Sequence, residues 1–110
     1  MKVTLIFPGQ GSQYLGMGKN LTELPECKEV FENADSAFDF SITGLMFEGP
    51  EDKLKLTEFT QPSIVTHSYA LFKGLKTFLD KEGIEVERVL GHSVGEYAAL
   101  AATGAIDFKD

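Results

Sequence analysis

The chain has a single cysteine, Cys27, and no tryptophan. One cysteine cannot form a disulfide within the chain, and no other cysteine or histidine stands at metal-ligand spacing from it. The pattern fits a buried, unreactive thiol. The sequence therefore predicts no metal site.

Basic residues are scarce. The 10 Lys and Arg residues face 17 Asp and Glu residues, which gives a formal net charge of −7. A nucleic-acid-binding surface needs clustered positive charge, and the sequence has no Lys/Arg cluster. We expect no nucleic-acid partner.

Long apolar runs are also missing. The longest stretches, such as residues 97–102, fall far short of the roughly 20 residues that a membrane-spanning helix needs. The N-terminus lacks the apolar region and small-residue cleavage site of a secretory signal. We expect no membrane contact and a cytoplasmic location.

The remaining composition is that of a globular domain. Of the 110 residues, 43% are hydrophobic and 25% are charged, which suffices for one compact unit with a modest core and leaves no room for a second domain. Residues 107–110 resemble a helix cap and a first helical turn, which is too short to be stable alone. We therefore interpret the chain as a piece of a longer protein.

Two segments have the β-branched and aromatic composition of strands. Residues 3–7 are rich in such side chains and are stopped by Pro8-Gly9, which predicts a buried first strand. Residues 86–90 predict a second strand. An alanine-rich helix follows this strand and ends near Thr103-Gly104.

Helices are expected between the two strands. Apolar residues recur at helical spacing over residues 25–40, and residues 41–60 favour only short helices. After Pro62, a long helix is predicted with Ser63 as its N-cap and its end at Gly83. This order of elements predicts an α/β fold, a parallel sheet with flanking helices.

The segment Gly91-His92-Ser93-Val94-Gly95 has the Gly-x-Ser-x-Gly pattern of a nucleophile elbow. In such a turn between strand and helix, the serine hydroxyl stands clear of the backbone at a helix N-terminus, where free N–H groups and the helix dipole favour a developing oxyanion. Ser93 is the candidate nucleophile, and the Val94 amide is a candidate oxyanion donor. The plain alternative is a tight turn with an idle serine.

A second glycine-rich loop, residues 8–13, follows the first predicted strand. A backbone N–H in this loop could supply the second oxyanion donor. Such loops also bind phosphates, although Gly-x-Gly-x-x-Gly and Gly-Lys-Ser/Thr patterns are absent here. By itself the loop is equally well read as an ordinary turn.

Four segments carry a resemblance to a known family: Phe7-Pro8-Gly9-Gln10-Gly11-Ser12-Gln13, Glu48-Gly49-Pro50, Thr60-Gln61-Pro62-Ser63 and Gly91-His92-Ser93-Val94-Gly95-Glu96-Tyr97. In order and spacing they resemble the N-terminal region of malonyl-CoA:acyl carrier protein transacylases and related acyltransferase domains. The resemblance implies an α/β-hydrolase-like acyltransferase core, with residues 1–110 as the N-terminal part of its large subdomain and the remainder of the catalytic domain absent.

The resemblance also implies a reaction and roles for individual residues. Ser93 would take a malonyl group from malonyl-CoA and pass it to the phosphopantetheine thiol of acyl carrier protein, a step of fatty acid biosynthesis that needs no bound cofactor. The amides of Gln10 and Val94 would form the oxyanion hole, and Gln61 and His92 would support substrate binding. The family's general-base histidine and its carboxylate-binding arginine would lie beyond residue 110.

Two other readings stay open. A serine esterase or thioesterase would use the same turn with water as acceptor. Alternatively, the chain is a catalytically incomplete fragment that needs a complementary chain to cover its sheet edge. If the chain is part of a transacylase, or if it is an incomplete fragment, we expect residues 1–110 alone to have little transferase activity.

Overall fold

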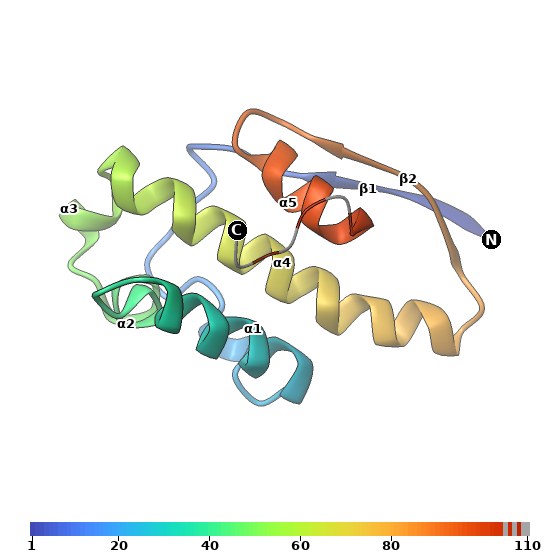
Figure 1. The fold of residues 1–110 in the computed structure, drawn as a ribbon, viewed down its shortest axis with the longest axis horizontal. Coiled ribbons are helices and arrows are strands. Elements are labelled where there is room, and N and C mark those ends of the chain that lie inside the picture. Colours follow the sequence, from blue (N-terminus) through green and yellow to red (C-terminus); the bar gives the residue numbers. More distant parts are fainter. Residues whose placement is uncertain (105, 107, 109–110) are drawn as a thin grey trace.

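The computed structural model describes residues 1–104, 106 and 108. Its elements are two strands, five α-helices and one 3-10 turn, and Figure 1 shows their arrangement. The strands are β1 (Lys2–Phe7) and β2 (Glu85–Gly91), and the helices are α1 (Pro25–Ala37), α2 (Ile42–Glu48), α3 (Glu51–Leu54), α4 (Thr57–Lys81) and α5 (Gly95–Thr103), with the turn η1 at Lys19–Leu21. The helical turn predicted at residues 107–110 lies mostly outside the described residues.

The two predicted strands are confirmed, and they pair in parallel. The register runs from Lys2 opposite Glu85 to Phe7 opposite Gly91, with one irregularity between Val3 and Thr4. A parallel pair requires a crossover connection, which α1 to α4 supply. The α/β prediction is therefore correct.

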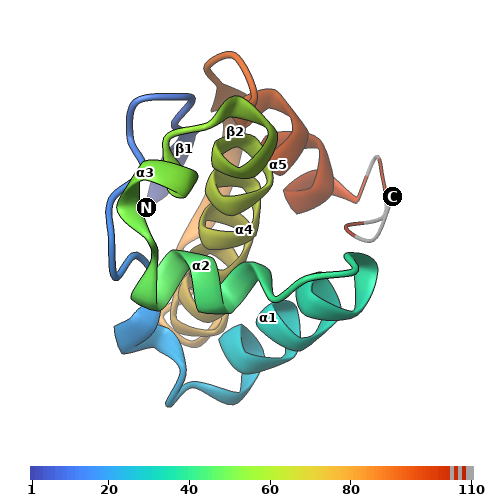
Figure 2. The ribbon, with the colours of Figure 1, turned by 90° about the vertical axis from the view of Figure 1, so that its left-hand side faces the viewer.

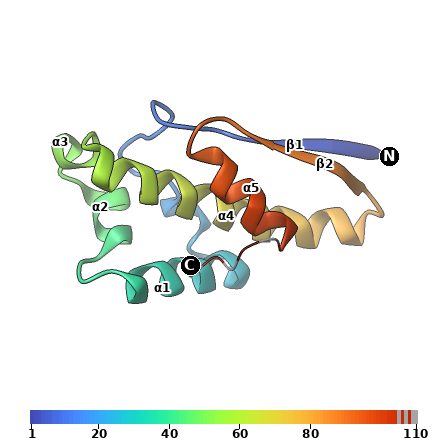
Figure 3. The ribbon, with the colours of Figure 1, turned by 45° about the horizontal axis from the view of Figure 1, so that its top comes forward.

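The prediction that the first strand is buried is wrong for most of its residues. Phe7 is buried, but Ile6 is 71% exposed. Leu90, which is opposite Ile6 in the register, is 51% exposed. In Figure 3 the helices α4 and α5 lie on one side of the two-stranded sheet, and no described helix covers the other side. Strand residues that face away from α4 and α5 are consequently open.

The long helix α4 starts earlier than predicted. It begins at Thr57 and contains Pro62, so Ser63 is not its N-cap. Instead, the buried Ser63 hydroxyl donates a hydrogen bond to the Phe59 carbonyl at 2.7 Å, one helical turn back. In the first turn, the buried Thr60 hydroxyl donates a hydrogen bond to the carbonyl of Leu54, at the end of α3. The predicted end is confirmed, because α4 stops at Lys81, two residues before Gly83.

The other helices cover α4 on two sides. Figures 2 and 3 show α1 and α2 beneath α4, on the side opposite the strands, with α5 beside α4. The helix predicted over residues 25–40 ends earlier, at Ala37, which leaves Phe38 outside it and 38% exposed. The short helices predicted within residues 41–60 are α2 and α3.

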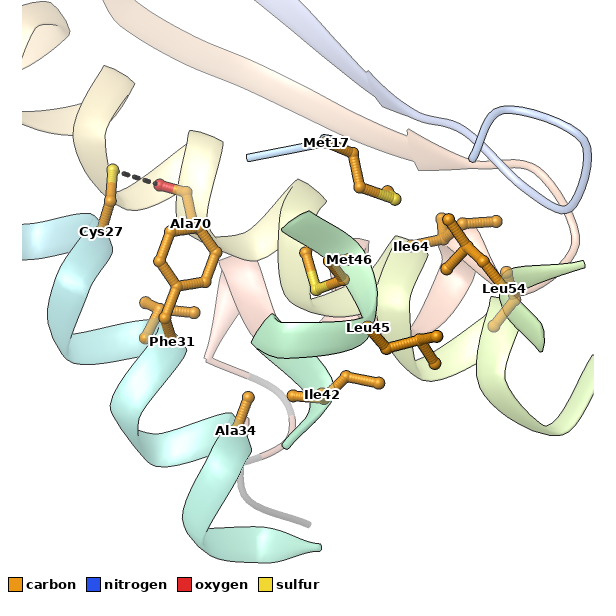
Figure 4. Close-up of a cluster of buried hydrophobic side chains, with 12 residues drawn as sticks. Met17, Cys27, Phe31, Ala34, Ile42, Leu45, Met46, Leu54, Ile64 and Ala70 are labelled. Carbon is orange, nitrogen blue, oxygen red and sulfur yellow. Dashed lines mark hydrogen bonds between the residues drawn. The ribbon is translucent and has the colours of Figure 1, made fainter. Parts of the chain in front are cut away.

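The main core lies between α1, α2 and α4. Its most deeply buried side chains include Met17, Ile42, Met46, Leu54 and Ile64 (Figure 4). In the same close-up, the Cys27 thiol donates a hydrogen bond to the Ala70 carbonyl at 3.1 Å, which joins α1 to α4. A smaller cluster of Phe7, Phe72, Ala98 and Ala99 joins the sheet to α4 and α5. Alanines on α5 permit this close approach.

Among the described residues, no helix is long and apolar enough to cross a membrane.

Candidate active site

Ser93 lies on the turn between β2 and α5. Its φ angle is 55°, and it is the one non-glycine residue with positive φ in the part of the chain that the structure describes. Left-handed backbone is unfavourable for a residue with a Cβ atom and is commonly retained where function requires it. The strained residue is thus the serine that the Gly-x-Ser-x-Gly pattern singled out.

Backbone hydrogen bonds hold this turn against the end of β1. The His92 amide donates to the Phe7 carbonyl at 3.0 Å. The Gly95 amide donates to the His92 carbonyl at 2.9 Å, and the Glu96 amide donates to the Ser93 carbonyl at 3.1 Å. Ser93 is therefore fixed from both sides.

Three glycines make the close packing around Ser93 possible. A Cβ atom on Gly91 would lie 2.4 Å from the Glu96 nitrogen, and one on Gly9 would lie 2.4 Å from the His92 carbonyl oxygen. On Gly95 it would lie 2.2 Å from the Phe7 carbonyl oxygen. Each clash is with backbone, so a larger residue at any of these positions would move the turn.

The glycine-rich loop after β1 lies directly against this turn. The ideal Cβ position on Gly9 is 3.1 Å from the Ser93 Cβ atom and 3.0 Å from the His92 Nδ1 atom. Gln10 follows Gly9 and is exposed. The structure thus brings the two segments that the sequence proposed as oxyanion donors to one place, although Gln10 and Val94 are 84 positions apart along the chain.

The two candidate donor amides are free. Within residues 1–104, 106 and 108, neither the Gln10 nor the Val94 backbone N–H donates a hydrogen bond. Gln10 makes only a side-chain bond, from its Nε2 atom to the Thr57 hydroxyl at 3.2 Å. Free N–H groups near a serine are one requirement of an oxyanion hole.

A cavity of about 780 Å³ opens beside the turn, between α1, α4 and α5. Val94 and Gln61 both line it, together with Tyr97 on the first turn of α5. The lining is largely apolar, with Asn33 and Thr66 as further polar groups. Gln61 and Val94 therefore line the same hollow, whereas Ser93, Gln10 and His92 do not line it.

In the part of the chain that the structure describes, no hydrogen bond joins Ser93 to the imidazole of His67 or His92. His67 packs in α4 against Tyr14, with ring centroids 6.0 Å apart. Burial lowers the pKa of His67 below its ordinary value of 6.5. The ring of His92 lies against Gly9.

Two residues near this site were not predicted from the sequence. Tyr97 lies three residues after Val94 on α5, and this helical spacing could have placed it beside the same cavity. Thr57, the partner of Gln10, carries no sequence signal, because the contact joins residues 47 positions apart.

The arrangement defines a class of protein, an α/β protein with a candidate catalytic serine on a glycine-flanked turn between strand and helix. Residues 4–110 match the family model described as "Acyl transferase domain". The chain belongs to this acyl transferase family.

Particular relatives are similar over nearly the whole chain. The malonyl CoA-acyl carrier protein transacylase of Bacillus subtilis is 44% identical over 110 residues, which cover 99% of this chain and 33% of the relative. The crystal structure of the acyl-carrier-protein S-malonyltransferase from Burkholderia pseudomallei superposes with a TM-score of 0.88 at 40% identity, over 100% of this chain and 35% of that one.

A second solved structure contains a partner. It is a type II PKS acyl-carrier protein in complex with its malonyl-transacylase, and it matches with a TM-score of 0.87 at 36% identity, over 99% of this chain and 35% of that one. The present chain thus spans about a third of the length of the relatives that it matches.

Proposed function

We propose that this chain is the N-terminal part of the large α/β subdomain of a malonyl-CoA:acyl carrier protein transacylase that acts in cytoplasmic fatty acid biosynthesis. Ser93 is its nucleophile. The observation that carries the proposal is the strained Ser93 backbone, at φ 55°, between two segments with free amides. The names of the relatives support malonyl as the acyl group.

The turn at Ser93 has the form of a nucleophile elbow, and its chemistry follows from its geometry. The Ser93 Oγ atom attacks the thioester carbonyl of malonyl-CoA and loses its proton to a base. The C–S bond then breaks, the CoA sulfur takes a proton, and a malonyl-serine ester remains. Attack by the phosphopantetheine thiol of acyl carrier protein reverses these steps and frees Ser93.

The oxyanion of each tetrahedral intermediate is stabilised by the amides of Gln10 and Val94. Val94 is the residue directly before α5, so its N–H belongs to the positive end of that helix dipole. Gln10 supplies the second donor from the residue after Gly9, which lies against the Ser93 turn. Gln61 and Tyr97 line the adjoining hollow, and His92 supports the loop at Gly9.

The base and the group that binds the malonyl carboxylate are assigned to residues outside 1–110. Neither His67 nor His92 bonds to Ser93 in the described residues, and a serine without a base is a weak nucleophile. Residues 1–110 alone should therefore transfer malonyl groups very slowly.

The acceptor distinguishes this proposal from a serine esterase or thioesterase. The test protein is a full-length chimera, in which residues 1–110 replace the matching third of the Bacillus subtilis relative. It is incubated with labelled malonyl-CoA and phosphopantetheinylated acyl carrier protein, and both products are measured. Malonyl-thioester on the carrier supports the transferase, whereas free malonate formed at the same rate with and without the carrier would support a hydrolase.

A second candidate is that the chain functions as one of two complementary chains. The observation in its favour is the open sheet face, on which Ile6 and Leu90 are 71% and 51% exposed. An apolar patch exposed on paired strands commonly marks an interaction surface. Co-expression of residues 1–110 with the remaining two-thirds of the Bacillus subtilis relative, as separate chains, tests this candidate. Copurification with activity would support it, and separate elution would refute it.

A further inference from the structure

The loop that carries Gln10 needs to be held in place if the Gln10 amide is to serve as an oxyanion donor. Its own hydrogen bonds only close it upon itself. The Ser12 hydroxyl and amide both donate to the Gly9 carbonyl, at 2.7 and 3.3 Å, and the Gly11 amide donates to the Gln13 Oε1 atom at 2.8 Å. These bonds shape residues 9–13 but do not orient them relative to Ser93.

One hydrogen bond leaves the loop. Among the bonds that residues 9–13 make with described residues, only the one from the Gln10 Nε2 atom to the Thr57 Oγ1 atom, at 3.2 Å, reaches another element. It therefore connects the residue whose backbone amide is the candidate donor to the start of α4.

Thr57 is suited to be a fixed anchor. It is the first residue of a 25-residue helix, and the neighbouring Thr60, in the same first turn, is fully buried and bonded to the Leu54 carbonyl. The Thr57 side chain itself is exposed, so its hydroxyl is not part of the core. Loss of that hydroxyl should leave the fold intact.

We propose that Thr57 is a positioning residue for the oxyanion hole, because its hydroxyl holds the Gln10 side chain and so fixes the Gln10 amide beside Ser93. This inference rests on the proposed transacylase function. Thr57 touches no reacting atom and acts only through Gln10. Its loss should slow the chemical steps and leave substrate affinity nearly unchanged.

The experiment is a double-mutant cycle in the full-length chimera. Thr57→Val, which keeps the shape and loses the hydroxyl, should lower kcat about fivefold, with KM for malonyl-CoA changed by less than about twofold. Thr57→Ser should restore most of kcat. In a Gln10→Ala background, Thr57→Val should have no further effect. Thr22→Val is the matched control, since Thr22 is an exposed threonine whose hydroxyl bonds only the local Lys19 carbonyl.

Two results would overturn the inference. The first is an unchanged kcat for Thr57→Val, and the second is an equally large loss in the Gln10→Ala background, which would mean that Thr57 does not act through Gln10. A Ser93→Ala variant separates this failure from failure of the proposed function. If Ser93→Ala abolishes transfer, the transacylase proposal stands even when Thr57 has no effect. If Ser93→Ala retains activity, both proposals fail.

Discussion

Gly95 lies directly against the carbonyl oxygen of Phe7, so closely that a Cβ atom on residue 95 would be 2.2 Å from that oxygen. This contact joins the start of α5 to the end of β1. It sets how near the Ser93 turn approaches the loop that carries Gln10. A glycine at position 95 is therefore required by packing, independently of any catalytic role.

Replacement of this glycine should be costly. Gly95→Ala is expected to destabilise the full-length chimera by about 1–3 kcal/mol, because the neighbouring atom is backbone and cannot rotate away. Thermal unfolding followed by circular dichroism measures the loss. Gly44→Ala in α2 is the control, since outside its own helix its Cβ would meet the Ser41 side chain, with Oγ at 3.1 Å and Cβ at 3.4 Å, and no backbone atom. An equal midpoint for Gly95→Ala and the parent would contradict the packing argument.

The positive φ of Ser93 predicts a conflict between stability and function. Ser93→Gly should be more stable than Ser93→Ala by about 1 kcal/mol, since glycine adopts left-handed backbone without a steric penalty and alanine does not. Both variants should lose activity. The unfolding midpoints of the two variants are compared with each other, because both lack the serine hydroxyl and the difference then reports the steric penalty of the backbone conformation. A more stable alanine variant would mean that the turn is not strained at Ser93.

His67 predicts a pH dependence. Burial lowers its pKa from the ordinary 6.5, so the unfolded chain binds a proton more readily than the folded one. The resulting loss of folding stability is absent above pH 6.5, and it grows as the pH falls from there toward the pKa of His67 in the folded protein. Between about pH 7.5 and pH 5, the thermal unfolding midpoint of the chimera should thus fall more than that of its His67→Gln variant. Parallel curves for the two proteins would contradict the assignment.

Cys27 should be chemically inert in the folded protein. Burial, and secondarily the charge of Glu26, raise the pKa of its thiol above 9.0, and a backbone interaction with Gly74 opposes this only in part. Little reactive thiolate is then present near neutral pH. Alkylation by iodoacetamide, followed by mass spectrometry, should be slow in buffer and fast in urea. Equal rates would show that the thiol is accessible in the fold.

Local chemistry made several elements predictable from the sequence. Pro8-Gly9 ends β1, Gly104 follows the end of α5, and the glycines around Ser93 mark a turn whose close packing the structure contains. In each case the residue type restricts the backbone at its own position. Such restrictions can be read without knowing the partners of the residue.

Features that depend on distant contacts were not predictable. The early start of α4 was missed because a proline inside a helix is locally unfavourable, and only the folded structure shows that the helix continues through Pro62 despite the lost N–H group. The exposure of Ile6 depends on which sheet face the helices cover, a property of the whole fold. The Gln10–Thr57 bond likewise exists only after folding brings residues 47 positions apart together.

The central claim is that Ser93 carries the acyl group, and intact-mass measurement tests it most directly. The full-length chimera, its Ser93→Ala variant and residues 1–110 alone are each incubated with malonyl-CoA without carrier protein. A single malonyl adduct on the chimera, absent from the Ser93→Ala variant and nearly absent from residues 1–110, is the predicted result. An adduct that persists in the Ser93→Ala variant would contradict the assignment of Ser93 as the nucleophile.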